Sequence, residues 1–221
     1  MTMKETMTLL GEDMELLNQS QWKVGITSIG KNAFAFCNMG TDITLPESIT
    51  SIGDYAFYGS RFSRFVIPDS VKSIGSLAFS GCLNLSSINI PDSVKSIGHC
   101  AFSSCSNLYS INIPEGIKEL DEPFSGCGVQ FLTINIKSVE QWCKINFKNS
   151  SVIGNTSISY GYSEGERYKY TYSLCVNGDI IENINVPETI KKIGRYTFAN
   201  CSSIKNVILP EEIKEIGDSA F

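Results

Sequence analysis

The chain has little of what enzymes, membrane proteins and nucleic-acid-binding proteins depend on. Histidine occurs once in 221 residues, charged residues make up only 19%, and the net charge at pH 7 is -5. No stretch gathers Lys and Arg into a basic patch, and a negatively charged chain repels phosphate backbones. No run approaches the roughly 20 apolar residues of a membrane-spanning helix. The sequence therefore favours neither nucleic-acid binding nor a membrane span.

Catalytic and metal-binding motifs are also scarce. The chain has no phosphate-cradling glycine loop, no nucleophile elbow and no His-Glu-x-x-His string. His99 adjoins Cys100 and lies near Cys105, but three potential ligands without a second cysteine pair do not make zinc spacing. We expect no enzyme activity, no metal and no cofactor.

What the chain does have is an internal repeat of 22 or 23 residues. An Ile-Gly pair followed by Phe occurs six times, and Leu120-Asp121 opens a degenerate copy. The phenylalanines of these copies are Phe34, Phe57, Phe79, Phe102, Phe124, Phe198 and Phe221. Such periods are typical of solenoids, in which one coil cannot bury its apolar side chains alone and stacks on its neighbours.

Each repeat contains a pattern typical of a strand. Ile88 and Ile90 flank Asn89, which gives the period of two of a strand with one buried face. A proline ends each strand at a fixed corner because it cannot donate to a ladder. The glycine after each Ile supplies a second corner, through a positive φ or a close backbone approach. The short Ala-Phe pieces predict a helical or 3-10 turn.

Cysteine follows the same period. It stands three residues after the Phe in five copies, at Cys37, Cys82, Cys105, Cys127 and Cys201, and Ser60 takes its place in a sixth. Free cysteine is among the most buried residue types and packs as a small apolar side chain. We expect one interior column of thiols, with disulfides or metal ligation as the less favoured alternatives.

The phrases LPESITSIGDYAF and IPDSVKSIGSLAFSGCLNLSSINIPDSVKSIG resemble the BspA-like leucine-rich repeats of bacterial and protist surface proteins, over roughly two-thirds of the chain. The resemblance implies a right-handed leucine-rich-repeat superhelix that is non-enzymatic, often secreted or on the cell surface, and linked to adhesion and protein binding. The expected fold class is an α/β repeat solenoid with one strand and a short helical or 3-10 turn per coil.

Irregular segments divide the chain into four parts. Residues 1–24 lack the repeat phrase, carry no signal-peptide pattern and predict an N-terminal helical cap. Repeats occupy 25–137 and 183–221, and the second set stops in mid-phrase. Between them, 138–182 predicts an irregular insertion that replaces two coils. It begins with a short helix, because Ser138 and Gln141 have capping-box spacing.

The insertion also predicts a tyrosine-rich hairpin. Aromatic residues alternate with polar ones on either side of a Ser-Glu-Gly-Glu turn, at Tyr160, Tyr162, Tyr168, Tyr170 and Tyr172. Insertions in solenoids often lie on the binding face, and tyrosine offers contact area at little rotamer cost. The alternative is that these rings cover the edge of the solenoid.

A second candidate surface consists of strand residues that point away from the core. In leucine-rich repeats this row faces the concave side, so the resemblance places a ligand-binding strip at Ser87, Asn89, Ser110, Asn112, Thr133 and Asn135. The alternative is a ladder of amides that bond to one another between coils.

These features favour a binding scaffold that recognises a protein or glycan through the concave face, the tyrosine-rich insertion or both. The alternative is a purely structural array within a longer surface or assembly protein. The resemblance favours a cell-surface or secreted location, although the chain carries no signal peptide.

Overall fold

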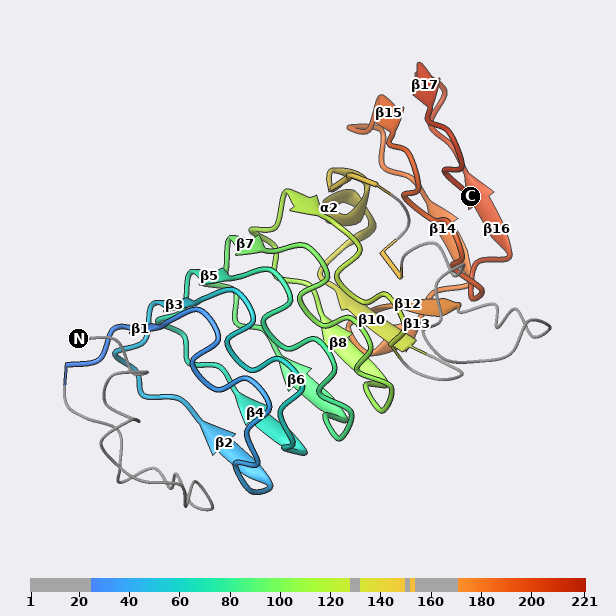
Figure 1. Cartoon of the computed structure of the whole chain (residues 1–221). Coiled ribbons are helices and arrows are strands. Elements are labelled where there is room, and N and C mark those ends of the chain that lie inside the picture. The colour runs from blue at the N-terminus through green and yellow to red at the C-terminus, as the bar shows by residue number, and fades with distance from the viewer. Residues whose placement is uncertain (1–24, 128–131, 150–151, 154–170) are drawn as a thin grey trace.

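A computed structural model describes residues 25–127, 132–149, 152–153 and 171–221. The chain winds into stacked coils whose short strands pair in parallel with their copies in the next coil (Figure 1). The predicted repeat solenoid is confirmed. The suggested cap at 1–24 and four of the hairpin tyrosines, Tyr160, Tyr162, Tyr168 and Tyr170, lie outside the described residues.

The largest sheet runs along the solenoid in the order β13-β12-β10-β8-β6-β4-β2. Its parallel strands are β2 (Asp42–Thr44), β4 (Arg64–Val66), β6 (Ser87–Asn89), β8 (Ser110–Asn112), β10 (Leu132–Ile136) and β12 (Tyr172–Val176). The central residue of each three-residue strand is buried, as the alternating pattern predicts, and the residues on either side point outward.

Each coil has a second strand, so the prediction of one strand per coil is incomplete. Four of these strands form a second sheet: β1 (Ser28–Ile29), β3 (Ser51–Ile52), β5 (Ser73–Ile74) and β7 (Ser96–Ile97). The row continues with β9 (Glu119–Leu120), which pairs with β11 (Asn146–Phe147). Two residues are too few to show an alternation, which is why the sequence pattern did not reveal these strands.

The glycine after each of these strands is required by close packing between coils. A Cβ at Gly98 would lie 2.4 Å from the backbone nitrogen of Ser76, and one at Gly75 would lie 2.5 Å from that of Asp54. Neither glycine has a positive φ. Of the two reasons that the sequence left open, close backbone approach is therefore the one that applies here.

The Ala-Phe segments are stacked turns and not helical turns, which corrects that part of the expected fold. Amide groups alternate between two kinds of acceptor: Ala56 N–H donates to Gly53 O at 3.3 Å, and Phe57 N–H donates to Ala78 O of the next coil at 2.7 Å. The residue before each Ala has a positive φ, for example 56° at Tyr55 and 53° at Leu77. Helix content is minimal, and α2 (Val139–Cys143) is the helix in the described part of the chain.

Phenylalanine and cysteine form continuous columns inside the coils. The rings of Phe57 and Phe79 stack with centroids 5.3 Å apart, and Phe79 stacks on Phe102 at 5.2 Å. Cys82, Cys105 and Cys127 are buried in successive coils, which confirms the predicted interior column at these three positions, whereas Cys37 and Cys201 are half-buried. These thiols also donate hydrogen bonds: Cys105 Sγ lies 3.1 Å from Phe79 O of the preceding coil. Their role as simple apolar fillers is corrected accordingly.

Helix α2 begins where the sequence places it. Ser138 Oγ accepts a hydrogen bond from Gln141 N–H at 3.1 Å, and Gln141 Oε1 accepts one from Lys137 N–H at 3.0 Å. The first bond satisfies a backbone donor that the helix leaves free, and the second satisfies the donor of the residue before the N-cap. Trp142 is fully buried on the inner side of the helix. The short capped helix is confirmed.

After α2 the chain returns to the large sheet. Leu132 of β10 pairs with Tyr172 of β12, 40 residues later, so these neighbouring strands are separated by more than one repeat period. The hairpin partner of β12 is β13 (Asp179–Ile180), joined to it through Asn177 and Gly178, which both have positive φ.

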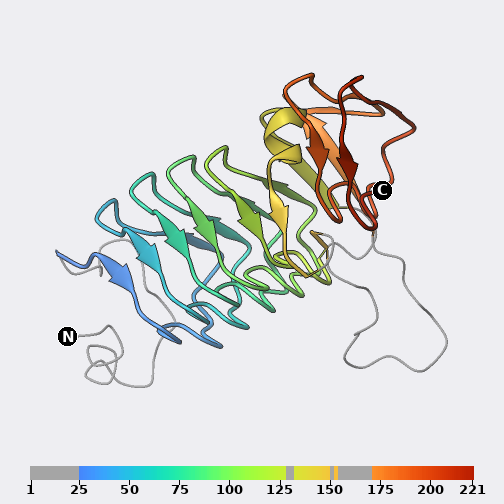
Figure 2. The same ribbon diagram turned by 90° about the horizontal axis from the view of Figure 1, so that it is seen from above.

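The last coils form separate two-stranded sheets beyond this point. β14 (Asn183–Asn185) pairs with β16 (Asn206–Ile208), and β15 (Lys192–Ile193) pairs with β17 (Glu215–Ile216). Figure 2 shows α2 between the green coils and these red coils. The solenoid therefore consists of a continuous sheet from β2 to β12, followed by a shorter stack.

Candidate binding surface

The structure brings the predicted strip together on the outer face of the large sheet. Ser87 pairs with Ser110, which pairs with Thr133, and Asn112 pairs with Asn135 in the same register. The flanking coils extend both rows, since Arg64 pairs with Ser87 and Val66 pairs with Asn89. The period of the repeat was sufficient to predict this alignment.

Asn112 has a structural role within this strip. Its Oδ1 accepts a hydrogen bond from Ile90 N–H at 2.8 Å, and its Nδ2 donates to Ile90 O at 2.5 Å. In the neighbouring coil the equivalent backbone donor, Ile113 N–H, bonds to the main-chain oxygen of Asn135 at 2.8 Å. The Asn112 amide thus replaces a backbone ladder bond, and both of its polar atoms are engaged.

Asn135 is also engaged between coils. Its Nδ2 donates to Ser110 Oγ at 3.1 Å and lies 3.4 Å from Ile111 O. By contrast, Ser87 and Asn89 are exposed, and Val66 is 49% exposed. The strip therefore divides into an inter-coil ladder at Asn112 and Asn135 and an open surface around β4 and β6.

Tyr172 has to be removed from the proposed tyrosine contact surface. It is only 1% exposed, and its main chain continues the large sheet. Its ring packs near Trp142, with centroids 6.1 Å apart, while its N–H donates to Asn200 O at 3.1 Å. Because the alternation of tyrosines continues as far as Tyr172, the sequence pattern assigned this residue of a core strand to the hairpin. The Asn177-Gly178 pair was the stronger hairpin signal, and it lies at the other end of β12.

The sequence pattern did not predict several exposed large apolar side chains, among them two close to the large sheet. Tyr109, directly before β8, is 58% exposed, and Leu83 is 56% exposed. Both stand at positions that vary between repeats, where periodicity carries no information. The available signal was a large apolar residue where several other coils have a polar one, such as Ser63 and Ser86 at the position of Tyr109.

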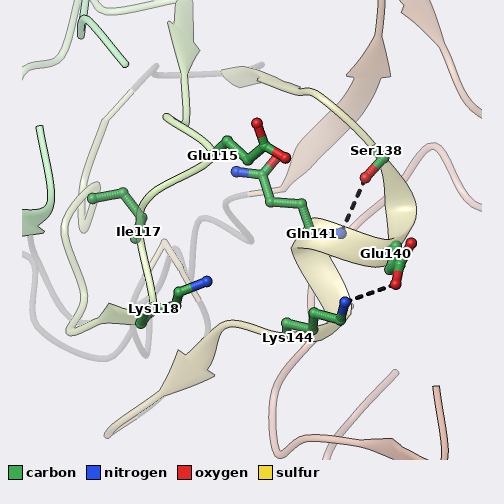
Figure 3. A pocket seen from close by; sticks show the side chains of 7 residues that line it. All are labelled: Glu115, Ile117, Lys118, Ser138, Glu140, Gln141 and Lys144. Carbon is green, nitrogen blue, oxygen red and sulfur yellow. Dashed lines mark hydrogen bonds and ion pairs between the residues drawn. The ribbon is translucent and has the colours of Figure 1, made fainter. Parts of the chain in front are cut away.

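A polar cleft lies beside α2 (Figure 3). Glu115 and Lys118 on one side face Glu140, Gln141 and Lys144 on the helix. Its groups are largely bonded already: Glu140 Oε1 accepts from Lys144 Nζ at 2.7 Å and from Thr189 Oγ1 at 2.9 Å. Gln141 Nε2 donates to Pro114 O at 2.9 Å. We interpret this cleft as the space left where α2 packs beside the coil that carries Glu115 and Lys118.

The described residues offer no arrangement of three or more His, Cys, Asp or Glu side chains suited to a metal ion. Within the same residues, no helix has the length and apolar character needed to cross a membrane.

The fold and its outer sheet face define a leucine-rich-repeat solenoid. The family model described as BspA type leucine-rich repeat region matches six copies, over residues 27–154 and 166–221. The chain therefore belongs to the BspA-type leucine-rich repeat family. No curated protein matches the sequence.

Solved structures of bacterial proteins resemble the chain. The pneumococcal vaccine antigen PcpA gives a TM-score of 0.54 at 20% identity, covering 94% of this chain. The T. pallidum leucine-rich repeat protein TpLRR gives a TM-score of 0.48 at 21% identity, and the match covers 94% of this chain and 75% of the TpLRR chain. The chain spans 58% of the PcpA structure. At this identity the likeness to PcpA shows a shared fold.

Proposed function

We propose that the chain is a non-enzymatic binding scaffold that recognises a protein ligand through the outer face of the sheet from β2 to β12. The observation that carries this proposal is the chemistry of the face. The outward side chains of β6, β8 and β10 are uncharged: Ser87, Asn89, Ser110, Asn112, Thr133 and Asn135. Charged residues are depleted at the cores of protein interfaces because their desolvation is costly.

Other parts of the surface lack this property. The last coils carry ion pairs, such as Lys192 with Glu215 at 2.7 Å and Lys205 with Glu182 at 2.8 Å. A partner that covered these pairs would have to desolvate both charges, whereas exposed pairs contribute only about 0–1 kcal/mol to stability. The uncharged part of the large sheet, over β6, β8 and β10, is thus the better contact region, since β2 and β4 carry the exposed Asp42–Arg64 pair on the same face.

Within this face, Val66, Ser87 and Asn89 are the proposed contacts. Val66 offers exposed apolar area, and the other two offer polar groups that are not buried in the inter-coil ladder. Asn112, Asn135 and Ser110 support this surface from the next coils. Tyr160, Tyr162, Tyr168 and Tyr170 are retained as a second proposed contact region in the segment between Ile153 and Tyr172.

The test compares two serines at the first residue of neighbouring strands. Ser87 opens β6 on the large sheet, Ser96 opens β7 on the second sheet, and both are exposed. The immobilised chain is first screened against a panel of purified proteins and glycans. For a protein that binds, Ser87→Arg should raise Kd at least about tenfold, or 1.4 kcal/mol, while Ser96→Arg leaves it unchanged.

Each other outcome identifies a different function or surface. Equal Kd values for wild type and Ser87→Arg would show that the large sheet is not the contact face. A loss confined to Tyr168→Ala and Tyr170→Ala would move the site to the tyrosine-rich segment. Binding only to glycans would replace the protein ligand. No binding together with concentration-dependent multimers in light scattering would support the structural array.

A further inference from the structure

The coil that follows β7 brings a thiol and an imidazole into contact at the protein surface. Cys100 Sγ lies 3.2 Å from His99 Nε2, and the His99 side chain is 47% exposed. Cys100 is half-buried and has a φ of 52°, in the left-handed region. Other coils place Tyr55, Leu77 or Glu122 at this backbone position. Cysteine occurs there in this coil alone among the described ones.

The next two coils complete the arrangement. His99 Nδ1 lies 3.2 Å from Asp121 Oδ2, and Asp121 Oδ1 accepts a hydrogen bond from Asn149 Nδ2 at 2.6 Å. Stacking of the coils thus aligns four side chains in the order Cys100, His99, Asp121, Asn149. Asn149 fixes the carboxylate, the carboxylate orients the imidazole, and the imidazole nitrogen that remains faces the sulfur.

We propose that Cys100 is a reactive thiol that exchanges with small cationic disulfides, with His99 as its general base and Asp121 as the residue that positions His99. A nucleophile within hydrogen-bond distance of a base that is itself oriented by a third group is the arrangement that activates thiols and hydroxyls in proteins. The proposal concerns this surface thiol and is independent of the binding face.

The exchange step balances without a metal or an external oxidant. His99 Nε2 takes the proton from Cys100 Sγ, and the sulfur attacks one sulfur of the disulfide R–S–S–R. A Cys100–S–S–R bond forms as the S–S bond of the reagent breaks. The leaving thiolate RS⁻ takes the proton from His99 and departs as RSH.

The surroundings of Cys100 explain why a base is needed and which reagent is preferred. Burial, followed by the charges of Glu122 and Asp121, raises the pKa of the Cys100 thiol to about 11, against a smaller opposing hydrogen bond from Ser103. At neutral pH such a thiol is almost entirely protonated, so the imidazole has to accept its proton. The same two carboxylates attract a cationic reagent and repel an anionic one.

Other cysteines of the chain provide an internal comparison. Cys37 is also half-buried, and burial raises its pKa, but its sulfur lies 3.6 Å from Ala35 O, with no imidazole as partner. Cys82, Cys105 and Cys127 are buried and bonded to backbone carbonyls. Cys100 should therefore react first.

The experiment uses cystamine, which carries two ammonium groups, and the dianionic disulfide of mercaptoacetate. Each is mixed with the full chain, and the modified cysteine and its rate are followed by mass spectrometry of peptides from pH 6 to pH 10. We expect cystamine to label Cys100 first, and at least about tenfold faster than the anionic disulfide does. Cys100→Ser should remove the fast phase.

Two variants separate base catalysis from a structural effect. His99→Gln should lower the rate at pH 7 about 100-fold, the lower end of what general bases contribute, and its rate should then rise about tenfold per pH unit. The wild-type rate should change little between pH 7 and pH 9. Asp121→Asn should be slower than wild type at pH 7 with both disulfides, because loss of the carboxylate's attraction alone would slow only the reaction of the cationic one.

Folding is verified by circular dichroism, and the exposure of His99 makes its substitution tolerable. The proposal is overturned if Cys37 reacts as fast as Cys100, or if His99→Gln leaves the rate at pH 7 unchanged. It is equally overturned if wild type and His99→Gln have pH profiles of the same shape, because the imidazole would then not accept the proton.

Discussion

At the scale of single residues, the cysteine position of each coil supplies a hydrogen-bond donor as well as volume. Cys82, Cys105 and Cys127 each donate to the carbonyl oxygen of a phenylalanine in the preceding coil, at 3.2, 3.1 and 2.8 Å. Ser60 takes the cysteine position in its coil and also donates to a phenylalanine of the preceding coil, since its Oγ lies 2.5 Å from Phe34 O. The shared property of the column is a small side chain with a donor.

This property leads to a prediction for Cys105. Cys105→Val keeps a small apolar side chain but removes one of the two hydrogen bonds to Phe79 O, which also accepts from Cys82 N–H at 3.2 Å. The loss of this one bond should lower the free energy of unfolding by about 0.5–1.5 kcal/mol. Cys105→Ser retains the donor, as Ser60 shows, and should cost less. Urea unfolding of the three proteins measures this difference. A valine variant as stable as the serine variant would show that the thiol only fills space.

Periodicity explains which of these residue-level features could be predicted. A repeat of 22 or 23 residues reports that positions stack, so the cysteine column and the alignment of His99 with Asp121 follow from the sequence. It does not report what a side chain bonds to within its column. The bonds of Asn112 to the backbone of Ile90 depend on the local register of two strands, which no pattern in the sequence reveals.

At the scale of elements, contact between adjacent turns of backbone determines where glycine is needed. Gly98 sits where a Cβ would come within 2.4 Å of main-chain atoms of the preceding coil. Gly30 holds the equivalent position in the first described coil, where a Cβ would meet nothing within 4 Å. The two glycines therefore have the same place in the repeat and different surroundings.

Alanine substitutions at these two glycines should consequently differ in sign. Gly98→Ala forces two coils apart and should destabilise the protein by about 3 kcal/mol, as overpacking does. Gly30→Ala should be neutral or stabilising by about 0.4–1 kcal/mol, because it restricts the unfolded chain. Thermal unfolding followed by circular dichroism compares them directly. A similar loss at both positions would mean that the glycines are required for conformation and not for close approach.

Strand length limited the prediction of other elements. Strands of two residues, such as β5 and β7, carry no alternation, and the stacked turns use a positive φ at residues as different as Tyr55 and Leu77. Helix α2 was predictable because its capping residues act locally. For the elements that depend on neighbouring coils, the sequence predicted that they recur in every coil but not which backbone geometry they adopt.

At the scale of the whole molecule, the large sheet stops at β12 and β13, and the last coils form their own sheets. Side chains and a few backbone bonds join the two stacks. Trp142 Nε1 donates to Thr197 O at 2.6 Å, and the indole packs against Phe147 with centroids 5.1 Å apart. Ser202 N–H donates to Tyr172 O at 2.9 Å. Trp142 is thus a buried link between α2 and the last coils.

Replacing this link should loosen the last coils more than the first. Trp142→Ala removes a large buried side chain, with an expected cost of about 3–5 kcal/mol, and removes the shorter of the two hydrogen bonds to Thr197 O, which leaves only the one from Tyr172 Oη at 3.5 Å. In repeat proteins each coil is stabilised mainly by contacts with its immediate neighbours. Amide hydrogen exchange should therefore accelerate in 183–221 and stay close to wild type in 25–100.

Phe57→Leu is the matched control for this experiment. Phe57 is equally buried but stacks between Phe34 and Phe79 in the first coils. Its substitution should accelerate exchange in that region and leave 183–221 close to wild type. If Trp142→Ala and Phe57→Leu instead accelerate exchange over the whole chain to the same extent, the two stacks unfold as one cooperative unit. The break in the sheet would then have no energetic consequence.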